Sequence, residues 1–277
     1  MSVSVVEFPS GGGRVLRGTL YRANEAPDAR AAVIAGALAV PQRFYEAFAN
    51  FLVGRGIAVL TFDYRGMGES RAGHARRDPA SMSEWGLDIA AAVDFMRGAV
   101  RPQSLALIGH SAGGQVAGLA QNFASVDSVV FVATQSGYWR LWSGLQKVRL
   151  WLFWHLMPVA TRIFGYFPSR AAGLGSENLP RGVALEWSRW GRHPRYLFGA
   201  PLDHSQYAAY GGPLLAFSLE GDQFAPRRGV EALLREYSSA RVEHRHVADR
   251  SIGHFGFFRR GIGERLWSDI ADALESV

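Results

Sequence analysis

Short apolar runs typical of β-strands alternate with helical stretches along most of the chain. The runs cover residues 31–36, 58–62, 105–108, 128–133 and 214–218, and helical stretches cover residues 42–54, 84–99 and 112–123. Because the runs are apolar without interruption, we expect both faces of each strand to be covered. The pattern predicts an α/β fold with a doubly wound, mostly parallel sheet.

The two ends of the chain extend this pattern. Residues 2–8 and 14–21 are β-rich and flank Gly11-Gly12-Gly13, which predicts a hairpin. A phosphate-binding loop would require a lysine and a strand-then-helix setting, which these glycines lack. Near the other end we expect a helix over 226–237, a strand over 241–247 and a helix over 261–275.

The alternation stops between residues 136 and 206, where tryptophans become dense: Trp139, Trp142, Trp151, Trp154, Trp187 and Trp190. This stretch is too long for a loop inside a compact domain, so we expect a helical cap at 136–206, inserted between core parts 1–135 and 207–277. Trp142 and Trp154 are candidates for lining an apolar substrate pocket under the cap, and the alternative is that the cap tryptophans are plain core.

Composition excludes several kinds of site. The chain has no cysteine, so disulfides, thiolate metal ligands and cysteine nucleophiles are excluded. Its single lysine, Lys147, lies in the aromatic-rich stretch far from any turn motif, which argues against a Ser-Lys dyad.

Charge and hydropathy bear on partners and location. The net charge is +6, but the arginines are scattered as singles and pairs, so we expect a solvated surface and no nucleic-acid partner. No signal peptide is visible, and a cytoplasmic location is expected. The most apolar stretch, residues 151–167, is too short to span a bilayer, so we expect a buried or amphipathic helix and no stable membrane insertion. Contact of the arginine-flanked aromatic face with lipid surfaces is a further possibility.

Gly109-His110-Ser111-Ala112-Gly113 follows an apolar strand and precedes a helix of small residues. This is the setting of a G-x-S-x-G nucleophile elbow, in which the serine takes a strained backbone conformation on a tight turn. Side chains at positions 109 and 113 would collide with neighbouring elements. The pattern predicts Ser111 as a nucleophile.

A serine hydroxyl requires a base, and the chain has eight histidines. His254 lies in a glycine-flanked segment after the strand at 241–247, where a loop would pass over the sheet. The orienting carboxylate should follow a late strand, and LEGDQFAP offers Asp222, with Glu220 in reserve. The chain order Ser111, Asp222, His254 is that of α/β-hydrolases.

The oxyanion of acyl transfer requires two hydrogen-bond donors. One donor should be the backbone N–H of Ala112. The second should come from the turn after the strand at 31–36, where Ala37 and Leu38 are equal candidates.

Four stretches together resemble the α/β-hydrolase superfamily, in particular a group of bacterial hydrolases of little-studied substrate: AGALAVPQRFYEAFANFLVGRGIAVLTFDYRGMGES, GHSAGG, LEGDQFAP and IGHFGFFR. The resemblance implies the same triad of Ser111, Asp222 and His254. Ala35-Gly36 stands where the family usually has His-Gly, and no family motif covers the cap.

Serine at the elbow argues against relatives that use aspartate there, such as haloalkane dehalogenases. We expect hydrolysis of carboxylic esters with small to medium apolar acyl groups, through an acyl-enzyme on Ser111 and without cofactor or metal. Thioesterase, amidase and acyltransferase activity are alternatives with the same triad. A metal site at His244, His246 and Asp249 and a catalytically silent binding protein are alternatives from other classes.

Overall fold

A single eight-stranded sheet runs through the molecule in the order β1-β2-β4-β3-β5-β6-β9-β10. The computed structural model describes residues 1–23 and 29–276, so residues 24–28 and 277 of the two core ranges lie outside the description. β1 (Ser2–Ser10) and β2 (Arg14–Arg22) form the expected hairpin, and β2 pairs antiparallel with β4 (Ile57–Phe62). The remaining neighbours are parallel, so the prediction of a mostly parallel sheet is confirmed.

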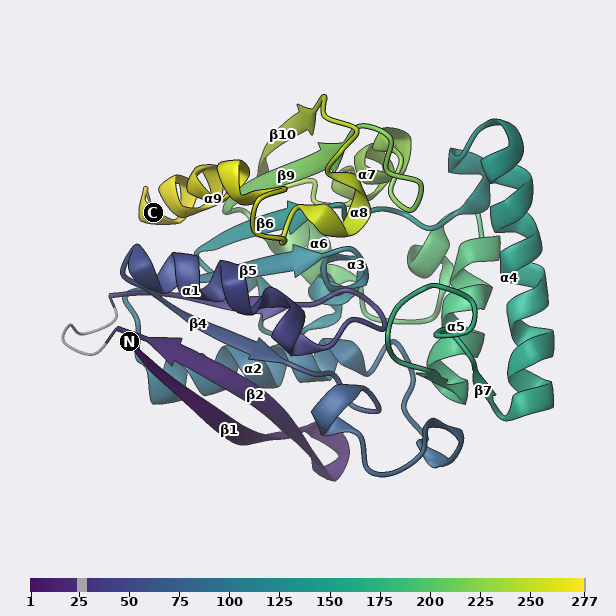
Figure 1. Ribbon diagram of the computed structural model, residues 1–277, viewed down its shortest axis with the longest axis horizontal. Coiled ribbons are helices and arrows are strands. Elements are labelled where there is room, and N and C mark those ends of the chain that lie inside the picture. Colours follow the sequence, from purple (N-terminus) through teal and green to yellow (C-terminus); the bar gives the residue numbers. More distant parts are fainter. Residues whose placement is uncertain (24–28, 277) are drawn as a thin grey trace.

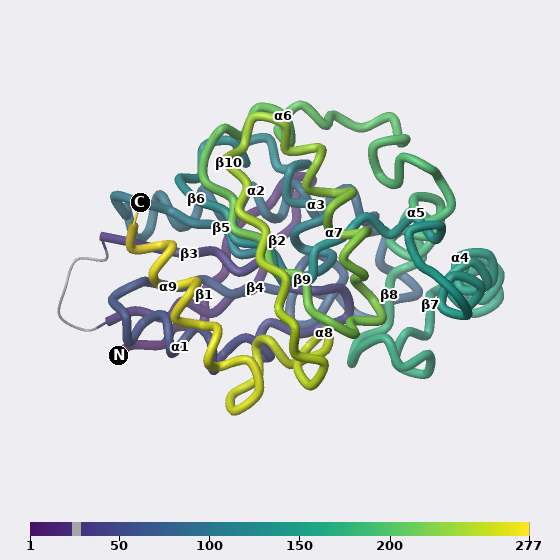
Figure 2. The backbone as a smooth tube through the Cα atoms, turned by 90° about the horizontal axis from the view of Figure 1, so that it is seen from above, coloured from purple at the N-terminus to yellow at the C-terminus, as the bar shows by residue number. Residues whose placement is uncertain are grey.

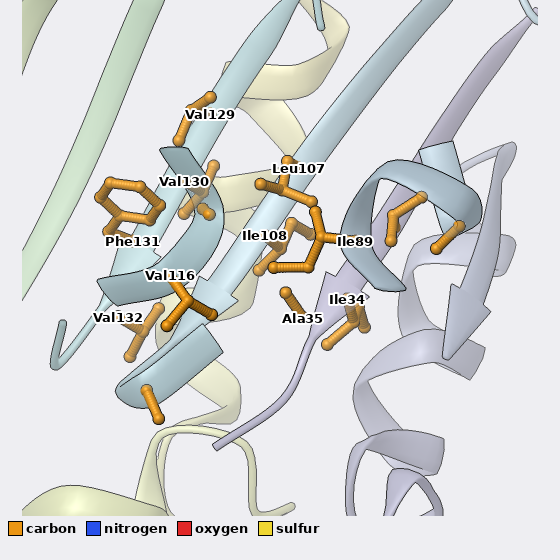
Figure 3. Close-up of a cluster of buried hydrophobic side chains, with 14 of the residues drawn as sticks. Ile34, Ala35, Ile89, Leu107, Ile108, Val116, Val129, Val130, Phe131 and Val132 are labelled. Atoms are coloured by element: carbon orange, nitrogen blue, oxygen red, sulfur yellow. The ribbon is translucent and has the colours of Figure 1, made fainter. Parts of the chain in front are cut away.

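The apolar runs form the central strands. These are β3 (Arg30–Ala35), β5 (Ser104–His110), β6 (Ser128–Val132) and β9 (Pro213–Leu219), with β10 (Arg241–Val247) at the edge. Figure 3 shows Ile34, Leu107, Ile108 and Phe131 packed together between strands and helices. Every residue of β4 is buried, as expected for strands covered on both faces.

Helices cover both faces of the sheet, as the doubly wound prediction requires. Seen from above in Figure 2, α1 (Glu46–Gly54) and α9 (Trp267–Glu275) lie on one side of the strands, and α2 (Trp85–Ala99) lies on the other. The short α6 (Ser205–Ala209) is on the α2 side, and α7 (Arg227–Leu234) connects β9 to β10.

The helix after β5 is shorter than the sequence indicates. α3 ends at Val116 (Ala112–Val116), and 3-10 turns at 117–119 and 123–125 follow in place of a continuous helix to residue 123. The hydroxyl of Tyr207 donates a hydrogen bond of 2.5 Å to the carbonyl oxygen of Gln115, the acceptor that a continuing helix would give to Leu119. Tyr207, which lies far from α3 in the sequence, thus occupies the carbonyl oxygen that would accept the next helical hydrogen bond.

Residues 136–206 leave the sheet and form mainly helices beyond the carboxyl ends of the strands (Figure 1). The segment contains α4 (Gly144–Phe164), α5 (Arg181–Arg192) and a small two-stranded sheet of β7 (Tyr166–Phe167) and β8 (Leu179–Pro180). α4 contains most of the apolar stretch 151–167, and it is the amphipathic alternative of the two expected: Trp154, Met157 and Thr161 are buried, while other positions are exposed. Among the described residues, no helix is long and apolar enough to cross a bilayer.

Candidate active site

Ser111 lies on the tight turn between β5 and α3. Its φ is 50° and its ψ is −116°, a strained combination for a residue with a side chain. The turn needs glycine neighbours because a Cβ atom on Gly113 would be 2.0 Å from the carbonyl oxygen of Ala35, and one on Gly109 would be 2.6 Å from Cα of Gly114. The backbone therefore holds the hydroxyl at the carboxyl end of the central strand.

His254 and Asp222 come to this serine from two other segments. His254 lies in α8 (Gly253–Gly256), and its Nε2 is 2.9 Å from Oγ of Ser111. Its Nδ1 is 2.8 Å from Oδ2 of Asp222, which follows β9. Because a carboxylate only accepts, Nδ1 carries the proton and Nε2 is free to accept from the serine hydroxyl. The arrangement is that of a nucleophile, a base and an orienting acid.

Backbone groups hold the carboxylate of Asp222 in place. Its Oδ1 accepts hydrogen bonds from the N–H groups of Phe224, at 2.8 Å, and Ala225, at 3.0 Å, so Oδ2 is left for His254. Glu220 faces a different set of partners, accepting from Nε2 of His246 at 3.0 Å and from Arg250 at 3.1 Å. These hydrogen bonds lower the pKa of Glu220, and they hold it away from His254.

Residues 26–171, more than half of the chain, match the family model described as serine aminopeptidase, S33. The chain belongs to this family of α/β hydrolases. No curated protein matches this hydrolase significantly in sequence.

Solved structures resemble the hydrolase over nearly its whole length at low identity. The Pyrococcus furiosus esterase Pf2001 is 15% identical with a TM-score of 0.66, covering 99% of this chain and 90% of its own. DcsB, solved with a substrate analogue, is 15% identical with a TM-score of 0.70 and 99% coverage of both chains. Est1E from Butyrivibrio proteoclasticus, solved with ferulic acid, is 14% identical with a TM-score of 0.65 and 98% coverage of both chains. At these identities the likeness shows a shared fold.

A cavity of about 390 Å³ opens at the Ser111 hydroxyl of the hydrolase, within the size range of small-molecule sites. Its wall is mainly apolar and comes largely from the 136–206 segment, including Trp142, Leu150, Phe153, Trp154 and Trp187. Both predicted tryptophans line it and are nearly buried. Their indole N–H groups donate to the carbonyl oxygens of Gln223, at 2.8 Å for Trp142, and Gly137, at 3.0 Å for Trp154.

The three predicted oxyanion donors differ in their hydrogen bonds. Ala112 is the first residue of α3, so its N–H has no partner within the helix. The N–H of Ala37 donates to the hydroxyl of Tyr45 at 2.7 Å. The N–H of Leu38 has no hydrogen-bond partner among the described residues, and Leu38 lines the cavity beside Ser111.

A buried chain of hydrogen bonds behind Ser111 was not predicted from the sequence. The hydroxyl of Tyr45 is 2.8 Å from Nδ1 of His110, and Nε2 of His110 is 3.0 Å from the carbonyl oxygen of His254. Burial of the ring and the nearby His254 hold the pKa of His110 well below its usual range, so this imidazole is neutral. The position of His110 inside the elbow was the only signal in the sequence, and nothing there indicated Tyr45.

Two polar side chains of the cavity wall were also missed. Oε1 of Gln115 accepts a hydrogen bond from the Tyr196 hydroxyl at 2.7 Å, and that hydroxyl accepts from the indole N–H of Trp187 at 2.8 Å. Nε2 of Gln135 donates to the carbonyl oxygen of Phe224 at 2.9 Å. Gln115 directly follows the GHSAGG motif and Gln135 follows β6, but nothing in their residue type indicated a place in the cavity wall.

The residues of the alternative metal site make hydrogen bonds to serines. His244 and His246 both contact the hydroxyl of Ser218, at 2.8 and 2.9 Å, and Asp249 bonds to Ser251. Within residues 1–23 and 29–276, no group of three or more histidine or acidic side chains could hold a metal ion. Ser218 has histidine partners, like Ser111, but it is fully buried in β9 and does not line the cavity at Ser111.

Proposed function

We propose that the protein is a serine carboxylesterase that forms an acyl-enzyme on Ser111 with small to medium apolar acyl groups. The observation that carries this proposal is the relay from Asp222 through His254 to Ser111, opening into an apolar cavity. Proteins of the same fold include esterases, such as those of Pyrococcus furiosus and Thermogutta terrifontis, which agrees with the proposal.

In the first half of the reaction, the Ser111 oxygen attacks the ester carbonyl while Nε2 of His254 takes the hydroxyl proton. Asp222 stabilises the imidazolium that forms. The tetrahedral oxyanion collapses, the carbon–oxygen bond to the alcohol breaks, and His254 returns the proton to the leaving alcohol. In the second half, water attacks the acyl-enzyme by the same route and releases the acid.

We assign the oxyanion donors as the N–H groups of Ala112 and Leu38. Ala37 is the weaker candidate because its N–H is engaged by the Tyr45 hydroxyl. A backbone N–H without another hydrogen-bond partner can bind the oxyanion without first breaking a hydrogen bond. Tyr45 then has a supporting role, since it fixes the turn on which Leu38 lies.

We assign residues 136–206 as a cap that forms the acyl pocket. The apolar wall residues in α4 and α5 support this role because they face the cavity at the carboxyl ends of the strands. An apolar wall favours acyl carbons by roughly 0.8 kcal/mol per buried methylene.

The family description raises a second candidate, cleavage of a peptide bond next to a free amino terminus. Such a substrate carries an ammonium group, which a carboxylate would normally bind. The described residues that line the cavity include no aspartate or glutamate, and they do include the cation of Arg149. This lining favours a neutral acyl group over an amino-terminal one.

The test is labelling by a fluorophosphonate probe together with ester turnover. Ser111→Ala should abolish labelling and lower kcat by about six orders of magnitude, as in triads that act as a unit. Ser218→Ala is the matched control, since it removes the other serine that bonds to histidines. Persistent labelling of Ser111→Ala, or loss of labelling in a folded Ser218→Ala, would refute the assignment. Faster cleavage of an aminoacyl anilide than of a simple ester would favour the second candidate.

A further inference from the structure

α4 carries apolar side chains on two opposite sides. One side contains Phe153, Trp154 and Met157, which face the cavity or the core. The other carries large apolar side chains that remain exposed. Figures 1 and 2 both show α4 as the outermost helix on its side of the molecule. Folding therefore does not explain the apolar residues on the second side of α4, because apolar surface stabilises the folded protein only when it is removed from water.

The exposed side chains form a continuous row, here called the outer row: Leu145, Val148, Leu152, Leu156, Val159 and Ile163. Their spacings of three and four residues place them along one stripe of the helix. Leu145 and Ile163, at its two ends, are 64% and 69% exposed. At a rise of 1.5 Å per residue the row is about 27 Å long. Isolated exposed apolar residues are ordinary, but a contiguous row of this length marks an interaction surface.

The charge around the outer row has one sign. Residues 128–176 contain no aspartate or glutamate, while they include Arg140, Lys147, Arg149, Arg162 and Arg170. Within the described part of the chain, none of these five cations forms an ion pair with a carboxylate. Elsewhere on the molecule arginines commonly pair with acidic groups, as Arg55 does with Asp272 and Glu275. Arg140 and Lys147 lie over the ring of Trp139, whereas the exposed Arg149 and Arg162 flank the outer row without a carboxylate partner among the described residues.

We propose that α4 docks on an anionic lipid surface, lying in its plane with the outer row in the boundary between headgroups and acyl chains. An apolar stripe flanked by cations and without acids is the chemistry that such a surface recognises, since the apolar side chains partition and the cations attract lipid phosphates. A helix with this much charge and polarity lies on the bilayer and does not cross it, in agreement with the absence of a spanning helix among the described residues.

Trp151 supports the proposed orientation of α4 on the lipid surface. It is 40% exposed at the edge of the outer row, and its ring is 4.5 Å from that of His155. Amphipathic aromatic rings favour the headgroup level of a bilayer. Docking in this orientation turns the opposite side of α4, which lines the cavity, away from the lipid and toward the core. The docking itself does not depend on the proposed esterase activity.

The experiment is co-sedimentation of the full chain with vesicles of phosphatidylcholine alone and with added phosphatidylglycerol. The protein should bind the anionic vesicles, and binding should weaken with added salt. Leu156→Glu and Ile163→Glu should each weaken binding about tenfold or more, because each removes a large apolar side chain from the boundary and adds a repelled charge. The Arg149→Gln and Arg162→Gln pair removes the two exposed cations of α4 that flank the outer row, and should weaken binding by about 25-fold, near fivefold per cation.

The matched control is Val5→Glu, since Val5 is 73% exposed on β1, far from α4 in the fold. It should bind as the parent does. Ser111→Ala should also bind fully, which separates docking from catalysis. Circular dichroism checks that each variant is folded, and quenching of fluorescence by brominated lipids, lost in Trp151→Phe, reports the contact directly.

Absence of binding to anionic vesicles would overturn the proposal, as would equal binding by Leu156→Glu and the parent. A dimer at low concentration that Leu156→Glu converts to monomer, without vesicle binding by the parent, would show instead that a second copy of the chain covers the outer row.

Discussion

Nε2 of His110 donates a hydrogen bond to the backbone carbonyl oxygen of His254 across 3.0 Å. A carbonyl can only accept, so Nε2 carries the proton and Nδ1 accepts from the hydroxyl of Tyr45. His110, the residue before the proposed nucleophile, thereby holds the backbone of the proposed base, and Tyr45 connects both to the turn at Ala37. Three segments of the site share one buried chain of hydrogen bonds.

Tyr45→Phe should impair both stability and turnover. Removal of the hydroxyl leaves the N–H of Ala37 and Nδ1 of His110 without partners, and each such buried group costs about 1–3 kcal/mol of unfolding free energy. The turnover number should fall with little change in KM. Tyr237→Phe is the control, because its buried hydroxyl has no hydrogen-bond partner in the described part of the chain, and its removal should be neutral or stabilising. Equal denaturation midpoints for the two variants would contradict the role of Tyr45.

Asp222→Asn should lower kcat by about 10⁴ and leave the fold intact, by holding the wrong tautomer of His254. The two backbone N–H groups that bind Oδ1 of Asp222 should still hold the side chain. Glu220→Gln is the matched change two residues away and should have little effect, since Glu220 bonds to His246 and Arg250. If steady-state kinetics showed that Glu220→Gln is damaging and Asp222→Asn nearly silent, Glu220 would be the acid.

Stability should decrease as the pH falls below about 6.5, and His110 should be one cause. Burial lowers the pKa of His110 in the folded protein, so in this pH range the unfolded chain binds the proton and the folded chain does not. The contribution reaches up to about 1.4 kcal/mol per pH unit below the unfolded pKa and vanishes above it. His110→Gln should flatten the slope of unfolding free energy against pH, whereas His155→Gln, on the exposed side of α4, should not. Parallel slopes for the parent and His110→Gln would exclude this cause.

Gly113→Ala should destabilise the elbow severely or prevent folding, because its Cβ atom would be 2.0 Å from the carbonyl oxygen of Ala35. Gly98→Ala is the control in the last turn of α2, where an added Cβ meets nothing within 4 Å. That change should be neutral or stabilise by up to about 1 kcal/mol. Chemical denaturation of the two variants measures the difference, and similar midpoints would show that the crowding is easily relieved.

The acyl-length profile should rise and then fall. With esters of increasing length, kcat/KM should climb about fourfold per added methylene until the cavity is full. Trp142→Ala should shift the optimum to longer chains, because Trp142 lines the cavity, and should leave labelling by a small fluorophosphonate intact. A flat profile, together with loss of labelling through unfolding, would mean that this tryptophan is core and would leave the substrate class open.

Much of the fold and of the candidate site could be predicted, because short sequence patterns reflect the conformation of the same short segment. The apolar runs indicated the strands of the parallel sheet, since a strand covered on both faces must be apolar throughout. The glycines around Ser111 indicated a turn that excludes side chains, and the structure places backbone atoms where those side chains would be. His254 and Asp222 stood after late strands, and the structure brings both to within hydrogen-bond distance of their expected partners.

The sequence by itself thus determined the fold class and the residues of the proposed triad, because periodicity and turn chemistry act over a few neighbouring residues. Tertiary structure alone decided the link from Tyr45 through His110 to His254, the end of α3 where Tyr207 binds the Gln115 carbonyl, and the exposure of the outer row of α4. Each of these joins or separates segments that lie far apart in the chain. Which side of a helix with two apolar sides is covered depends on what packs against it, and a local pattern carries no information about that partner.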